Sequence, residues 1–315
     1  MGFINAMKNI YEAVDANKRK SILVIAFFVV FVFCATYFIS QAASIYMGYE
    51  PGGLGFMGLA LIVSGLMSFG SYYFSDSIIL GISGARPADR KREFDFYTVA
   101  ENLAIASGLP KPKLYVIDDD SPNAFATGRD PDHAVICATR GLLQKLSRTE
   151  LEGVIAHEMS HVRNYDTRLQ SLVAVMVGMV ALLGDWFLRI SWWGGDRSDD
   201  QKDSGALGAI FIILGIVFAI ASPFIAQLIQ LAISRRREFL ADSGSVTITK
   251  QPSGLISALK KISVDAVPLR TANKATAHLY IVNPLGKGGM AKRFSGLFNT
   301  HPPVEERIKA LQTML

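Results

Sequence analysis

The chain has 315 residues, half of them apolar, with a mean hydropathy of +0.29 and a formal net charge of +5. This apolar content argues against an ordinary soluble domain, because the charged residues stand mostly outside a few long apolar stretches. The positive charge is explained by short clusters of lysine and arginine beside those stretches. No basic motif with a known docking geometry accompanies them, so we expect no nucleic-acid partner.

Four apolar stretches each reach the roughly 20 residues that cross a bilayer core. They predict membrane spans at about residues 21–47, 54–75, 169–190 and 206–231. A buried core helix is the alternative for each stretch. This alternative has most weight for the third stretch, because Gln170 and Asp185 lie in it.

Clusters of lysine and arginine orient these spans. They stand before the first span, after the second and directly after the fourth, at Lys18–Lys20, Arg90–Arg92 and Arg235–Arg237. The positive-inside rule therefore places both termini and residues 76–168 in the cytoplasm. We expect an integral membrane protein in contact with a lipid bilayer. A bacterial inner membrane is the first choice and an organelle membrane the alternative.

Between the second and third spans, the pattern predicts a small mixed unit of helix and strand. A helix is expected at 89–107, ended by Gly108 and Pro110. Strands are expected at 113–117, 123–127 and 134–139, with the last two forming a hairpin. Ser147 and Glu150 then form a capping box, S-x-x-E, that starts a helix at Arg148.

That capped helix carries the most informative motif of the chain. Residues 157–161 are His-Glu-Met-Ser-His, the H-E-x-x-H pattern of zinc hydrolases. Histidines four apart lie on one helix face, so His157 and His161 can reach a single metal ion. Glu158 can then hold a water bound to that metal. The alternative is a pair of surface histidines, as we expect for His133 and His278.

After the fourth span, the pattern predicts a helix continuing through Leu240, a helix at 253–262 and a terminal helix at 303–314. A long polar and glycine-rich connection, 264–300, separates the last two. Connections of that length are usually functional or disordered.

A catalytic zinc ion needs a third protein ligand beside the two histidines. The downstream histidine of the metzincins is absent, because Asn164 and Thr167 stand where glycine and histidine should be. A glutamate from a second helix is the other common solution, and Glu238 is available with Asp242 one turn later. One of these carboxylates could ligate zinc while the other accepts the N–H of a ligating imidazole. Spacing alone leaves the two roles open.

The motif His-Glu-Met-Ser-His, followed by Glu-Phe-Leu-Ala-Asp at 238–242 with predicted spans before and between, resembles the HtpX-type membrane zinc metalloproteases. These belong to the glutamate-ligand group, the gluzincins, and are relatives of the integral-membrane proteases that trim prenylated proteins. The resemblance covers nearly the whole chain. Further matching stretches are Asn123-Ala124-Phe125-Ala126, Asn164-Tyr165-Asp166 and His301-Pro302-Pro303 with Arg307.

The resemblance implies a metal site and a catalytic base. His157, His161 and Glu238 would ligate one Zn²⁺ ion per chain, and Glu158 would be the general base. Asp242 would hydrogen-bond a ligating histidine.

The resemblance also implies roles around that site. Asp166 would orient His161 or cap its helix. His301 and Arg307 become candidates for stabilising the oxyanion or holding the substrate. The substrate-binding residues would be those of an edge strand that pairs with an extended peptide: Asn123, Ala124 and Phe125.

We therefore expect a mainly α membrane protein with about four transmembrane helices and a cytoplasmic α+β zincin-type metalloprotease domain. Residues 1–82 would form an N-terminal segment with the first transmembrane hairpin, and 83–168 the first half of the protease domain. Residues 169–234 would form a second transmembrane hairpin, and 235–315 the second half of the domain. The two site helices are expected to run directly into the third span and out of the fourth. This would put the zinc close to the cytoplasmic membrane face.

The expected function is that of a membrane-bound zinc endopeptidase acting on protein or peptide substrates. The resemblance suggests a role in stress-related quality control of misfolded membrane proteins. One alternative is a prenyl-protein processing protease, which would use the same site. The other is a non-enzymatic membrane scaffold with a degenerate site, which would require a missing ligand or base.

Overall fold

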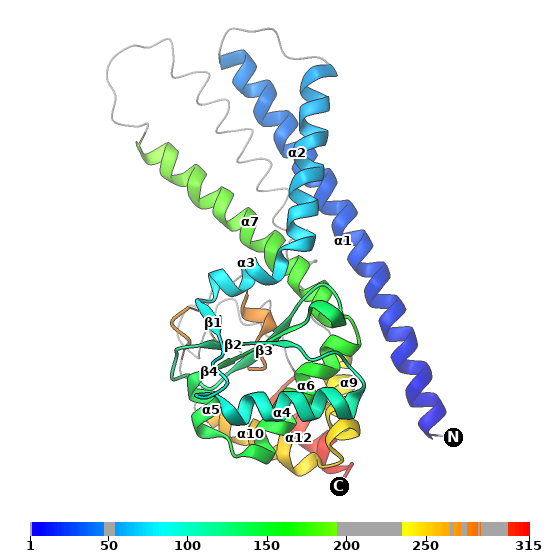
Figure 1. Ribbon diagram of the computed structural model, residues 1–315. Helices are drawn as coiled ribbons and strands as arrows, with labels where there is room; N and C mark the ends of the chain where they lie inside the picture. The colour runs from blue at the N-terminus through cyan, green and yellow to red at the C-terminus, as the bar shows by residue number, and fades with distance from the viewer. Residues whose placement is uncertain are drawn as a thin grey trace.

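The computed structural model describes residues 2–46, 54–193, 235–264, 268–271, 276–282, 284 and 302–315. Two long helices project from one side of a compact α/β unit, and a third runs alongside the unit and extends beyond it on the same side (Figure 1). These helices are α1 (Gly2–Tyr46), α2 (Leu54–Tyr73) and α7 (Asp166–Trp193).

The long helices overlap three of the four predicted spans. Within the described residues, however, no helix is both long and apolar enough to cross a membrane. The fourth predicted span, 206–231, lies outside the described residues. The number of spans therefore stays a prediction.

The long helices pack together where they leave the α/β unit. Val24 and Phe28 of α1 are buried against Leu169 and Val173 of α7. The α1 helix is continuous from Gly2, so the lead-in expected at residues 1–20 and the first predicted span form one rod.

A four-stranded sheet of order β1-β2-β4-β3 forms the centre of the α/β unit. The strands are β1 (Ala85–Pro87), β2 (Lys113–Ile117), β3 (Ala124–Thr127) and β4 (Val135–Thr139). β2 and β4 are parallel, and the other two pairings are antiparallel. The three predicted strands and the hairpin are confirmed. β1 was not predicted, because three residues that include a proline carry no strand signal.

Helices cover both faces of the sheet. One core lies between the sheet and α4 (Phe94–Ser107), α6 (Arg148–Arg163) and α10 (Pro252–Val264). The other face packs against α7, α3 (Ser75–Ile82) and the segment 277–280. Every residue of β3 and β4 is buried as a result.

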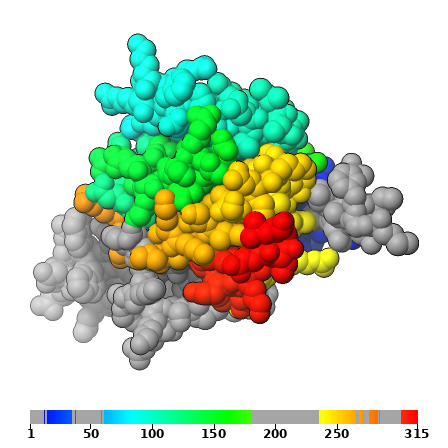
Figure 2. Space-filling model, turned by 90° about the horizontal axis from the view of Figure 1, so that it is seen from below, coloured from blue at the N-terminus to red at the C-terminus, as the bar shows by residue number. Residues whose placement is uncertain are grey.

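The predicted helices are present with shifted ends. The helix expected at 89–107 begins only at Phe94, because the Asp89 carboxylate accepts from the N–H groups of Lys91 and Arg92 and closes a turn there. The capping box at Ser147 and Glu150 is confirmed. The remaining helices are α5 (Arg140–Lys145), α9 (Arg235–Thr249) and α12 (Val304–Gln312). Viewed from below, α9, α10 and α12 lie together on one face (Figure 2).

The expected continuous helix from the histidine motif into the third predicted span is wrong. α6 ends at Arg163, and α7 begins at Asp166 after a two-residue break. Tyr165 lies in the left-handed region with φ of 58°, a conformation that cannot continue a right-handed helix. The break turns the first residue of α7 back towards α6.

Candidate metal centre

Helix α6 presents His157 and His161 to the interior of the protein. All residues from Val154 to Val162 are buried, because α6 packs between the sheet and the helices α9 and α10. The two histidines are one helical turn apart, and their Nε2 atoms are 3.2 Å from each other. A buried pair of this kind excludes the alternative of two surface histidines.

Close packing of α9 against α6 brings the third candidate ligand to the same place. Ser245 of α9 donates a hydrogen bond to the Gly153 carbonyl of α6 at 2.8 Å. At Gly244, an added Cβ would overlap the side chain of Ser160. These small residues let the two backbones approach, and Glu238 then projects from the start of α9 towards both histidines.

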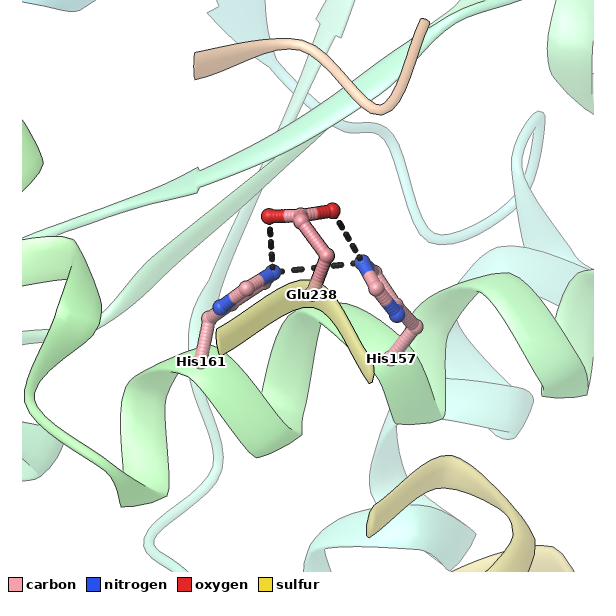
Figure 3. A group of neighbouring side chains, drawn as sticks. All are labelled: His157, His161 and Glu238. Carbon is pink, nitrogen blue, oxygen red and sulfur yellow. Dashed lines mark hydrogen bonds and ion pairs between the residues drawn. The ribbon is translucent and has the colours of Figure 1, made fainter. Parts of the chain in front are cut away.

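His157, His161 and Glu238 form a cluster that can hold a metal ion (Figure 3). Glu238 Oε2 lies 3.7 Å from His157 Nε2, and its Oε1 lies 3.5 Å from His161 Nε2. Ligand atoms around a tetrahedral zinc ion with bonds of about 2.0–2.1 Å are about 3.3–3.4 Å apart. The separation of the two Nε2 atoms and the distance from each of them to a Glu238 oxygen are within a few tenths of an ångström of this value, and one atom from each residue lies within 4.8 Å of the others.

Carboxylates on the far side of each imidazole select the tautomer that a metal requires. Asp242 Oδ1 lies 3.0 Å from His157 Nδ1, and Asp166 Oδ2 lies 2.9 Å from His161 Nδ1. Each carboxylate favours a proton on Nδ1 and leaves the Nε2 lone pair free for a metal. Glu238 thus faces the Nε2 atoms of both histidines, whereas Asp242 faces Nδ1 of His157.

Arg307 of α12 is fully buried behind this cluster. Its guanidinium group donates to Asp242 from Nε at 2.9 Å and from Nη2 at 2.6 Å. A third nitrogen, Nη1, lies 3.6 Å from Glu238 Oε2. Two nitrogens of the guanidinium group are thus used on Asp242. Arg307 therefore lies behind the carboxylate that contacts His157.

The charges of the cluster suit a bound cation. Burial and Arg307 lower the pKa of His157 to about 4, so this imidazole is neutral at pH 7, as a ligand must be. Burial alone would lower the pKa of His161, but the Asp166 hydrogen bond and the Glu238 carboxylate raise it to about 9. The same negative charge would stabilise a divalent ion between the three ligands.

Glu158 lies in the same buried environment with the properties of a general base. Burial raises its pKa to about 7, with a further contribution from the Glu238 carboxylate. The backbone N–H of Ala126 on β3 faces this carboxylate and opposes the rise in its pKa. A base with a pKa near the working pH can both take up and release a proton.

The expected substrate-binding edge is engaged by the chain itself. Asn123 Nδ2 donates to the Val282 carbonyl at 2.8 Å, and the Ala124 carbonyl accepts from the Ile281 N–H at 3.0 Å. Phe125 packs on the Tyr280 ring with centroids 5.0 Å apart. The segment 280–282 therefore covers the Ala124 end of β3, whereas the Ala126 end faces Glu158.

The remaining three histidines of the chain lie outside the metal-ligand cluster or outside the described residues. His301 lies outside the described residues. His133 is exposed as expected, with Nδ1 2.6 Å from Asp130 Oδ1. His278 was expected to be exposed, but it is buried with Nε2 3.1 Å from the Gln170 carbonyl, because the segment 277–280 packs under α7.

Asn17 was missed by the sequence analysis. Its Nδ2 donates to Asp166 Oδ1 at 2.7 Å and to the Asn164 carbonyl at 2.9 Å. Asn17 thereby connects α1 to the carboxylate that holds His161. No local pattern could have identified it, since its partners stand 147 and 149 residues away.

Sequence comparison relates this chain to one peptidase family and to proteases of other organisms. The model of peptidase family M48 matches residues 90–315 of this chain. A protease HtpX homolog of Dictyoglomus turgidum is 45% identical over 305 residues, covering 96% of this chain and 94% of the relative. Another HtpX homolog, from Caldanaerobacter subterraneus, is 44% identical and covers 98% of both chains.

More distant relatives extend the same match. A protease HtpX homolog of Ligilactobacillus salivarius is 38% identical over 305 residues and is covered completely by 97% of this chain. Among solved structures, S. mikatae Ste24p superimposes with a TM-score of 0.45 and 20% identity. That superposition covers 80% of this chain and 57% of Ste24p.

Proposed function

Because this chain belongs to peptidase family M48, we propose that it is a zinc endopeptidase that cleaves membrane proteins at the cytoplasmic face of a bilayer. It is a metalloprotease, and its substrates are proteins or peptides. The observation that carries the proposal is the meeting of two histidines, one glutamate ligand and a buried base within one cluster.

The proposed ligands are His157, His161 and Glu238. These residues would hold a zinc ion, whose chemistry would be to activate a water and polarise the carbonyl of the peptide bond to be cleaved. Glu158 accepts the proton of the attacking water and delivers it to the leaving amine.

Residues behind the ligands keep this arrangement in place. Asp242 and Asp166 hold the two imidazoles in the ligating tautomer. Arg307 acts in this proposal as a positioning residue that fixes Asp242, since its Nε and Nη2 atoms already donate to that carboxylate. The complete set of ligand, base and supporting carboxylates argues against a non-enzymatic scaffold.

We propose that an extended substrate pairs with β3 beside Ala126. The Ala124 carbonyl is engaged by Ile281, so the pairing would begin at Ala126, the end of β3 that faces Glu158. Backbone pairing of this kind binds peptides without reading much of their sequence. Such broad recognition suits the quality control of misfolded membrane proteins.

Cleavage and zinc content measured together test the chemistry. In a casein cleavage assay, Glu158→Gln should retain zinc and lose at least about 100-fold in rate, as expected for removal of a general base. Glu238→Ala should lose both zinc and cleavage. Glu152→Gln is the matched control on the same helix, and it should keep both. Full activity of Glu158→Gln would rule out the mechanism.

The proposed membrane placement has its own test. Glu238 follows Ser234, the end of the fourth apolar stretch, by four residues, which is about 6 Å along a helix. Single-span reporter proteins with an unstructured cytoplasmic tail should be cut within about eight residues of their span, which is about 25 Å of extended chain. Cut sites mapped by mass spectrometry and spread evenly along the tail would contradict this placement.

A further inference from the structure

A half-open cavity of about 520 Å³ lies between α1 and α9, beside the metal centre. Glu12, Ala16 and Lys20 contribute from one face of α1, four residues apart from each other. The first two turns of α9 form the opposite wall. The beginning of α9 is visible next to α1 in Figure 2.

The cavity is lined by an excess of positive charge. Lys20, Arg236 and Arg237 face it, and Glu12 is the one carboxylate among the described residues that line it. Arg237 is buried and lies 3.5 Å from Asp166 Oδ1. Lys20 and Arg236 form no salt bridge within the described part of the chain. Burial and the nearby Arg237 lower the pKa of Lys20, with Asp166 opposing them, and an anion bound beside Lys20 would favour its charged form.

Part of the lining is apolar. Phe239, Leu240 and Met314 supply this surface next to the cations. Lys20 is the last residue before the first predicted span, and Arg236 is the second residue after the fourth apolar stretch. Basic pockets at the cytoplasmic ends of membrane helices are suited to lipid headgroups, since acyl chains can remain in the bilayer beside them.

We propose that this cavity binds the phosphate headgroup of an anionic phospholipid. The inference rests on the proposed membrane placement of the protein. Lys20 and Arg236 pair with the phosphate, and Phe239 and Leu240 contact the glycerol and the first part of the acyl chains.

The cavity is connected to the metal centre by two of its own lining residues. Asn17 donates to Asp166 Oδ1, and Arg237 Nη1 lies 3.5 Å from the same oxygen. The other oxygen of Asp166 holds His161. A headgroup bound in the cavity therefore restricts the motion of Asn17 and Arg237, the two residues that fix the Asp166 carboxylate. Lipid binding is thereby linked to the orientation of a zinc ligand.

Lipid binding can be measured without any cleavage. The full chain carrying Glu158→Gln is purified in a neutral detergent and titrated with dihexanoyl phosphatidylglycerol. Native mass spectrometry counts bound lipid, and thermal unfolding follows the stabilisation. We expect one tightly bound phosphatidylglycerol and a raised unfolding midpoint. Because no activity is read, loss of lipid binding and loss of protease function remain distinguishable.

Charge-matched variants locate the binding. Lys20→Gln with Arg236→Gln should weaken phosphatidylglycerol binding on the order of 25-fold, from the contribution of two cations near an anionic headgroup. Arg19→Gln with Arg235→Gln removes the same charge from adjacent exposed positions outside the cavity, and should change binding by less than about threefold. Equal losses in both double variants would overturn the proposal.

Titrations with other ligands distinguish an anionic lipid from a neutral lipid and from free phosphate. Equal binding of dihexanoyl phosphatidylcholine, or equal protection by inorganic phosphate, would overturn the assignment to an anionic lipid. If the double variant does not fold, Arg236→Gln alone is used, because Arg236 is exposed and its replacement disturbs no packing. This single variant should weaken binding about fivefold, and unchanged binding would refute the proposal.

Discussion

Replacement of Asp166 by asparagine should weaken zinc binding although Asp166 touches no metal. The Asp166 carboxylate uses its two oxygens for different partners, Oδ2 for His161 Nδ1 at 2.9 Å and Oδ1 for Asn17 Nδ2 at 2.7 Å. Asparagine has one acceptor oxygen, so it cannot serve both. If its amide nitrogen faces His161, the imidazole adopts the tautomer with a proton on Nε2, which cannot ligate zinc.

The magnitude follows from the number of partners lost. Loss of one such supporting contact typically lowers metal affinity 10- to 100-fold, which corresponds to about 1.4–2.7 kcal/mol. We expect Asp166→Asn to fall in the upper half of this range, because His161 and Asn17 compete for the same remaining oxygen and because Asp166 is fully buried.

Zinc affinity is measured by competition with a chelator in the Glu158→Gln background, which prevents self-cleavage. Asp76→Asn is the matched control, since Asp76 also stands in the first turn of its helix and its carboxylate accepts hydrogen bonds from the neighbouring Ser77. It removes the same charge from a helix N-terminus without touching the site. A zinc affinity of folded Asp166→Asn within threefold of the parent, or an equal loss in Asp76→Asn, would refute the reasoning.

Three further outcomes test the fold around the site. Burial alone would raise the pKa of Glu150, but hydrogen bonds, the largest from Lys261, lower it to about 2. The stabilisation from Glu150 is therefore present above pH 4.5 and lost as the pH falls towards 2. Glu150→Gln should cost about 1–2 kcal/mol in chemical unfolding at pH 7 and almost nothing near pH 2, and equal costs at both would contradict the assignment. Gly153→Ala should lower the unfolding free energy by roughly 1–3 kcal/mol, since its Cβ would meet the α10 backbone, whereas Gly81→Ala, which meets nothing, should be nearly neutral in the same assay. Arg307→Met should destabilise the protein by roughly 3–5 kcal/mol by leaving a buried carboxylate unpaired, and a thermal midpoint equal to that of the parent would exclude this role.

Local patterns predicted the parts of the site that lie on single elements. The capping box at Ser147 and the four-residue spacing of His157 and His161 are properties of one helix, so they could be read directly. The family resemblance is confirmed by the M48 match and by relatives of 38–45% identity. The β2 and β4 strands were predicted because their apolar residues stand between clear turns.

Features that depend on contacts between distant segments could not be predicted. The break at Tyr165 has no glycine or proline to signal it, and it is the packing of Asp166 against His161 and Asn17 that accompanies the change of direction. His278 was assigned to the surface because its neighbours are polar, yet the segment around it folds under α7. Burial of a histidine in an irregular segment is set by tertiary packing, for which sequence has no periodicity.

The dispersed origin of the metal centre has a consequence for biosynthesis. His157 and His161 emerge from the ribosome long before Arg307, which is 150 residues later than His157. Until Arg307 is present, closing the site would bury Asp242 without its cation, which is strongly unfavourable. A nascent chain that ends before Arg307 therefore holds its histidines on an unfinished surface. Each chain therefore becomes an active protease only after its last site helix has been made.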